Sequence, residues 1–268
     1  MLRAVVLVVS VVPMLGCGGK PPPAPAAPAA ADAATFATPE EAAAGAAPEL
    51  APEAEIDCRP FGDAEAPRLC LVQPATPEPG VLPYRLVLID AAPAGAWRVL
   101  DRVEDTFQNR PQVLDDGEAE AEVSLGDAHE VGPGKVALAV ELSGTYTMQY
   151  EGGGTADRYE STTLYWVRDG RLRELLKVET RRSSSGETDG YEEQSFDFEE
   201  RATGGMYDVV VATHTVHNSW PTNETTDETT RARLTWNGDG YDHATIEDPD
   251  EPDEPEDPGD PGDPDDGD

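Results

Sequence analysis

The stretch KVALAVELSGTYTMQY, residues 135–150, decides the fold class of this chain. Large apolar side chains occupy every second position of its first half, at Val136, Leu138, Val140 and Leu142. A period of two is that of a β-strand, because successive side chains of a strand point to opposite faces. Gly144 interrupts the alternation and predicts a bulge or a bend. The stretch therefore predicts a long β-strand with one apolar face.

Shorter runs of the same kind lie on both sides of this stretch. They cover residues 69–72, 84–89, 97–103, 161–167, 172–180, 191–199, 206–216, 230–236 and 241–246. Asp169-Gly170 between two of these runs predicts a type I′ hairpin, which needs positive φ at both central residues. Asn237-Gly238-Asp239-Gly240 predicts the last hairpin. No amphipathic helix of 12 or more residues is expected.

These runs predict an all-β domain over residues 56–246, an antiparallel meander closed as a sandwich or a barrel. A doubly wound α/β sheet with a nucleotide site is not expected. The side chains expected inside are those of Val87, Ile89, Trp97, Val136, Leu138, Val140, Tyr165, Val167, Val209, Val211 and Trp236.

Charge is distributed unevenly along the chain. The 268 residues hold 54 acidic and 19 basic side chains, a net charge of −35. Residues 247–268 alone carry thirteen acidic side chains and no basic one, among prolines and glycines, and predict a disordered tail. Residues 17–55 are rich in Ala and Pro and predict a disordered linker, within which a short helix is an alternative. Such acidity argues against nucleic acid as a partner, because phosphate backbones would repel the chain.

The N-terminus has the features of an export signal. Arg3 is followed by an apolar run over residues 4–12, too short to span a bilayer. Met14-Leu15-Gly16-Cys17 then resembles the lipobox of bacterial lipoproteins, although Met14 stands where that family usually has Leu. The resemblance implies a signal peptide over residues 1–16, cleavage before Cys17 and lipidation of Cys17. It places the protein in the bacterial cell envelope, in the outer membrane, facing the periplasm or the cell surface.

Lipidation of Cys17 leaves two cysteines, Cys58 and Cys70. An even pair in an exported protein predicts a disulfide, because the compartment is oxidising. Two free buried thiols are the alternative. The spacing excludes a CxxC redox or zinc site.

No catalytic motif of the GxSxG, HExxH or SxxK kind occurs in the sequence. His214 and His217 lie three apart on a predicted strand, so their side chains are expected on opposite faces. Residues 237–242 resemble a calcium loop, but Thr235 and His243 replace two expected ligands. We therefore predict no cofactor, no metal site and no enzymatic activity. The expected function is that of an envelope lipoprotein with a non-catalytic binding or structural domain. Its expected partners are the membrane, contacted through the lipid, and an envelope protein or polysaccharide, contacted through the domain. The alternatives are a calcium-dependent adhesion module and an envelope polysaccharide hydrolase.

Overall fold

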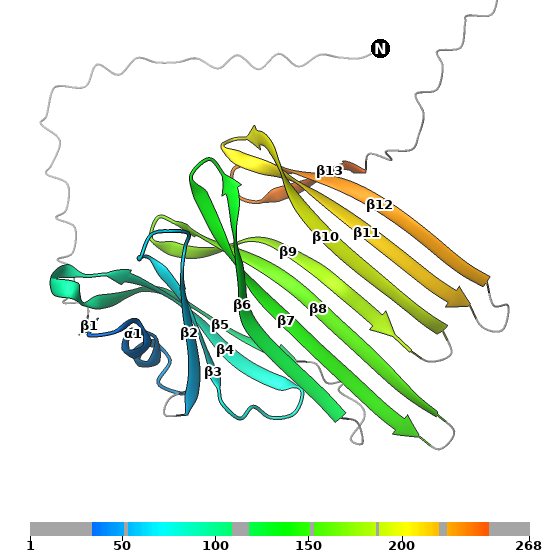
Figure 1. Cartoon of the computed structure of the whole chain (residues 1–268), viewed down its shortest axis with the longest axis horizontal. Coiled ribbons are helices and arrows are strands. Elements are labelled where there is room, and N and C mark those ends of the chain that lie inside the picture. Colours follow the sequence, from blue (N-terminus) through cyan, green and yellow to red (C-terminus); the bar gives the residue numbers. More distant parts are fainter. Residues whose placement is uncertain are drawn as a thin grey trace, which may run out of the picture. The chain divides into compact units, whose positions relative to one another are not determined.

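A computed structural model describes residues 34–50, 53–108, 118–150, 153–185, 188–219 and 224–246 of the chain (Figure 1). The signal peptide, Cys17 and the acidic tail predicted from the sequence lie outside these residues. Within them, strands dominate and every pair of neighbouring strands runs antiparallel. The predicted all-β antiparallel fold is thus confirmed.

The strands form two sheets. The smaller has the order β1-β5-β4-β3-β2, formed by β1 (Thr35–Phe36), β2 (Ala54–Pro60), β3 (Arg68–Pro74), β4 (Val81–Ala91) and β5 (Trp97–Gln108). The larger runs in reverse sequence order from β13 to β6, formed by β6 (Glu118–Gly132), β7 (Lys135–Tyr150), β8 (Gly153–Arg168), β9 (Arg171–Ser184), β10 (Thr188–Thr203), β11 (Met206–Ser219), β12 (Glu224–Trp236) and β13 (Tyr241–Ile246). One α-helix, α1 (Pro39–Ala46), and a 3₁₀ turn, Pro93–Gly95, complete the described elements.

Tight turns join most neighbouring strands of the larger sheet. Asp169 and Gly170 have φ of 53° and 71°, so the predicted hairpin between β8 and β9 is confirmed. Of the bulge or bend predicted at Gly144, the bulge is wrong. Gly144 pairs with Ala121 and Tyr159 without a register shift, and the shifts of this region lie at Leu125–Ala128 and Glu160–Thr162.

The two sheets pack face to face as a sandwich. Its core combines Leu69, Leu71, Leu82, Tyr84 and Leu86 of the smaller sheet with Val123, Leu125, Leu138, Val140, Leu142, Tyr165 and Leu172 of β6–β9. Leu138, Val140 and Leu142 of β7, three of the four apolar side chains that opened the sequence analysis, face this core. Of the eleven side chains expected inside, Val136, Val167 and Val211 are half-buried and the others are buried.

A second core covers the opposite face of β6–β9, where the larger sheet curls over itself. Ala137, Ala139 and Leu164 of the inner strands meet Met206, Val209, Leu234 and Trp236 of the outer ones. The β6–β7 turn meets the β10–β11 turn so closely that a side-chain carbon on Gly132 would lie 2.6 Å from the carbonyl oxygen of Gly205. Strands β6–β9 therefore form a middle layer, buried on both faces near these turns.

The linker predicted over residues 17–55 needs a correction, because residues 34–50 are folded onto the domain. Ala42 and Ala43 of helix α1, and Ala47 directly after it, are completely buried against Val72, Val87, Ile89 and Trp97, on the face of the smaller sheet away from the sandwich core. Pro39 does not break this helix, because it stands in its first turn, where the missing N–H is not needed. The small alanine side chains let the helix approach the sheet closely. β2 likewise begins at Ala54, inside the predicted linker.

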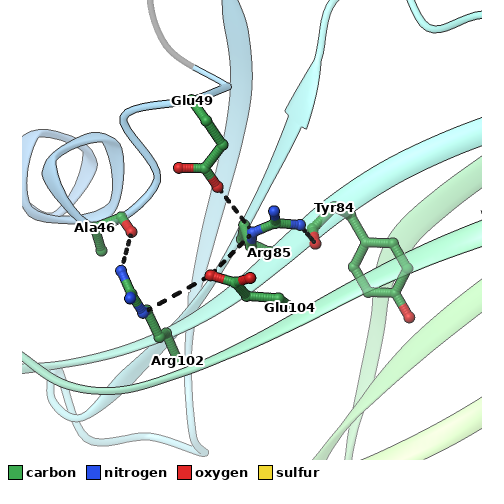
Figure 2. A network of polar contacts seen from close by, with 6 residues as sticks. All are labelled: Ala46, Glu49, Tyr84, Arg85, Arg102 and Glu104. Carbon is green, nitrogen blue, oxygen red and sulfur yellow. Dashed lines mark hydrogen bonds and ion pairs between the residues drawn. The ribbon is translucent and has the colours of Figure 1, made fainter.

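Charged side chains hold the segment after α1 to the sheet (Figure 2). Arg102 donates a 3.1 Å hydrogen bond to the carbonyl of Ala46, one of the carbonyls left without a partner at the end of the helix. Arg85 Nε lies 2.9 Å from Glu49 Oε1 and 3.6 Å from Glu104 Oε1. Both contacts are ion pairs without hydrogen-bond geometry at Nε. The guanidinium of Arg85 also donates to the carbonyl of Tyr84 at 2.9 Å.

The predicted disulfide between Cys58 and Cys70 is present. The two cysteines are direct partners in the register of β2 and β3, so the bond ties the edge strand β2 to the sheet. The two cysteines are 12 residues apart in the sequence.

Candidate binding sites on the domain

A cleft of about 680 Å³ opens at the rim of the sandwich, between the end of β5 and strands β8 and β9. Aromatic side chains from both sheets form part of its wall. The rings of Phe107 and Tyr159 stack at a centroid distance of 5.9 Å, and Tyr84 lies on the same wall. Both sheets are therefore needed to build this cleft, which we call the rim cleft.

The rim cleft carries charges of both signs. Asp105 and Asp157 bring carboxylates, and Arg158, Lys177 and Arg182 bring cations. Arg182 lies 4.0 Å from Glu179, whereas Lys177 makes no ion pair with a described residue. Stacked rings beside hydrogen-bonding groups of both kinds suit a polar organic ligand.

Tyr84 joins the aromatic and the polar parts of the rim cleft. Its hydroxyl donates a 2.9 Å hydrogen bond to Asp105 Oδ2. Burial, and after it the hydrogen bond to the Asp105 carboxylate, raises the pKa of Tyr84 well above its ordinary value of 10. The hydroxyl therefore stays protonated at neutral pH, where it orients Asp105 and does not act as a base.

A second, acidic cavity of about 400 Å³ lies on the other face of β6–β9, lined by Glu122, Glu141 and Glu160. Glu160 forms an ion pair with Arg158, which partly neutralises the cavity. Among the described residues, no group of three or more His, Cys, Asp or Glu side chains is arranged to hold a metal ion.

The histidines considered from the sequence lie apart. His214 and His217 both lie on β11, with opposite parity and therefore on opposite faces, as predicted. His214 Nε2 lies 2.8 Å from Asp227 Oδ1 of β12, and the His214 ring packs edge-on against Tyr191. His129 lies on β6 beside the rings of Phe196 and Phe198.

In the turn that resembles a calcium loop, the side chain of Asn237 hydrogen-bonds to backbone N–H groups of the same turn. Asn237 Oδ1 accepts the N–H groups of Asp239 and Gly240, both at 2.9 Å. Asp239 is fully exposed and lies 3.7 Å from Arg168. The side-chain oxygen of Asn237 thus stabilises the hairpin turn between β12 and β13.

No family model, curated protein or solved structure matches this chain. In the part of the chain that the structure describes, no helix has the length and apolarity required to cross a bilayer. Sequence reasoning identified Cys58 and Cys70 but missed the rim cleft. Its residues come from five strands and carry no common local pattern, so no sequence signal marked it.

Proposed function

We propose that this protein is an envelope lipoprotein, held at a bacterial membrane by lipid on Cys17, whose β domain binds a ligand without converting it. The proposal rests on one observation above all, the sequence Met14-Leu15-Gly16-Cys17 after a single positive charge and a short apolar run. Two or three acyl chains on one cysteine would give a lasting anchor, because each buried methylene contributes about 0.8 kcal/mol.

The rim cleft supports the binding part of the proposal. Its volume lies within the range of ligand sites, and its stacked rings and mixed charges supply several ways to hold a polar envelope component, a polysaccharide or a protein. Residues 18–33 lie between Cys17 and the first residue that the structure describes. An extended segment adds about 3 Å per residue, so the anchor would leave the domain free to reach partners away from the membrane.

The anchor is tested with Cys17→Ala in the full-length chain. We expect the wild-type protein to incorporate labelled palmitate and to remain with the membranes after an alkaline carbonate wash. The Cys17→Ala variant should incorporate no label and should leave the washed membranes, whereas a Ser10→Ala control in the same segment should behave as the wild type. A Cys17→Ala variant that stays bound to washed membranes would contradict the lipid anchor.

A further inference from the structure

The larger sheet splits between β9 and β10 (Figure 1). These strands pair with each other only over Arg181–Ser184 and Gly190–Glu193, near the turn that joins them. The earlier part of β9 pairs with β8, and the later part of β10 pairs with β11. On the open edge of β9, the N–H of Leu172 donates to Asp101 Oδ2 of β5 at 2.9 Å.

A groove of about 410 Å³ lies where the strands separate. Its apolar lining comes from both sides of the split: Leu175, Leu176, Val178, Val211, Leu234 and Tyr241. We call it the interior groove. Its volume falls in the range of small-molecule sites, and Glu174, Lys177, Gln194 and Thr213 add polar groups to its lining.

A wider cavity of about 750 Å³ adjoins the interior groove, and Glu174 lines both. Trp166 lines the wider cavity and meets Trp236 edge-on at a centroid distance of 5.8 Å. Trp236 in turn meets Tyr241 of the groove at 5.5 Å. A continuous row of rings therefore connects the two cavities.

Arginines are concentrated at this wider cavity. Arg168 is engaged, since it donates to the carbonyl of Gly238 at 3.0 Å and lies 3.7 Å from Asp239. Arg171 and Arg173 are exposed, and their side chains form no ion pair or hydrogen bond with any residue that the structure describes. The acidic residues at the cavity are Asp169, Glu174 and Asp239, so the charge here is balanced although the chain carries −35.

We propose that the interior groove binds the acyl chain of an anionic amphiphile, whose head group lies on Arg171 and Arg173. The groove supplies the apolar surface that removes a hydrocarbon chain from water, and the two guanidinium groups supply charge-assisted hydrogen bonds to a phosphate or carboxylate. This site shares Lys177 with the rim cleft and is otherwise lined by different residues. The inference thus goes beyond the proposed function and does not depend on the lipid at Cys17.

The direct test titrates dodecyl phosphate into the full-length chain that carries Cys17→Ala, so that no lipid of the protein itself can occupy the groove. Calorimetry below the critical micelle concentration measures binding. We expect saturable one-to-one binding of dodecyl phosphate. Dodecyltrimethylammonium should bind at least about tenfold more weakly, and butyl phosphate and inorganic phosphate should not bind, because one lacks the anion and the others the chain.

Two variants separate the head-group contact from the groove. Arg171→Gln with Arg173→Gln should weaken dodecyl phosphate binding by about tenfold or more, the loss of at least one charge-assisted hydrogen bond. Arg231→Gln is the control, because Arg231 lies on the face of β12 opposite to Ala232 of the groove. Thr213→Trp should block binding by filling the groove, which Thr213 lines.

Arg171 and Arg173 are exposed, so we expect their double variant to fold. It therefore tests the inference even where Thr213→Trp fails to fold. Equal affinity for the anionic and cationic probes, binding of phosphate alone, or no binding of any probe would overturn the inference. So would an arginine variant that binds as the control does. None of these outcomes alters the fractionation of Cys17→Ala, so the inference and the lipid anchor can fail separately.

Discussion

At the scale of single residues, burial holds three tyrosine hydroxyls in the protonated form. Burial is the largest cause that raises the pKa values of Tyr84, Tyr165 and Tyr241. For Tyr165 the pKa rises to about 12, with the carboxylates of Glu174 and Asp105 adding to the effect of burial. Tyr241 uses its proton to donate a 2.7 Å hydrogen bond to the carbonyl of Tyr207.

These tyrosines predict a loss of stability in alkali. An unfolded tyrosine ionises near pH 10, whereas the folded Tyr165 keeps its proton to about pH 12. The contribution of Tyr165 is therefore complete below pH 10 and declines as pH rises from 10 to 12, by about 1 kcal/mol at pH 11. Urea unfolding of wild type and Tyr165→Phe should show a fall between pH 8 and pH 11 that is smaller in the variant by about this amount. The measurement at pH 8 gives the cost of removing the hydroxyl itself, and an identical fall in both proteins would contradict the assignment.

Local chemistry made some residues predictable. Asp169-Gly170 forms the expected turn because positive φ at two successive positions is a local requirement that few residue pairs meet. The disulfide between Cys58 and Cys70 followed from the cysteine count and the predicted export of the chain. Arg171 and Arg173 could not be recognised as free cations, because the absence of a partner depends on the folding of distant strands.

At the scale of elements, α1 begins at a capping box that the Ala- and Pro-rich composition of the segment made easy to overlook. Thr38-Pro39-Glu40-Glu41 has the spacing of a capping box, in which a Thr is followed three residues later by Glu. Thr38 Oγ1 accepts the N–H of Glu41 at 3.1 Å, and Glu41 Oε2 accepts the N–H of Ala37 at 3.1 Å. The surrounding alanines and prolines predicted a linker, because alanine side chains offer little apolar area to offset the entropy cost of ordering the segment. In the structure, however, three alanines are completely buried against the smaller sheet, and this burial supplies the apolar area.

Removing this cap should loosen α1. Thr38→Ala leaves an N–H of the first turn without its partner, and we expect the free energy of unfolding to fall by about 1 kcal/mol. Amide hydrogen exchange over residues 39–47 should become faster at the same time. Thr226→Ala, on an exposed residue of β12, is the control and should change stability by less than about 0.5 kcal/mol. Unchanged exchange in α1 would show that packing on the sheet, and not the cap, holds the helix.

At the scale of the whole domain, the sequence predicted strands but not the way the larger sheet divides. Periodicity gives the two faces of each strand, and the apolar run of β4 reflects burial on both, with Leu86 and Leu88 facing away from Val87 and Ile89. It does not say which neighbour a strand pairs with over its full length. The split between β9 and β10 is such a feature of pairing, and the β6–β7 and β10–β11 turns make a further long-range contact within the larger sheet. Lys135 holds these turns together by donating to the carbonyl of Gly205 at 2.7 Å.

The middle layer predicts that both halves of the domain unfold together. Strands β6–β9 supply side chains to the sandwich core and to the second core, so neither core can persist when this layer opens. Leu138→Ala creates a cavity on the sandwich side of β7 and should lower the free energy of unfolding by about 2–5 kcal/mol. Hydrogen exchange in β4 and in β11 should then report the same decrease, although β11 does not contact Leu138's core. If the amides of β11 kept their wild-type protection from hydrogen exchange while those of β4 lost it, the two cores would unfold independently. That result would contradict the prediction.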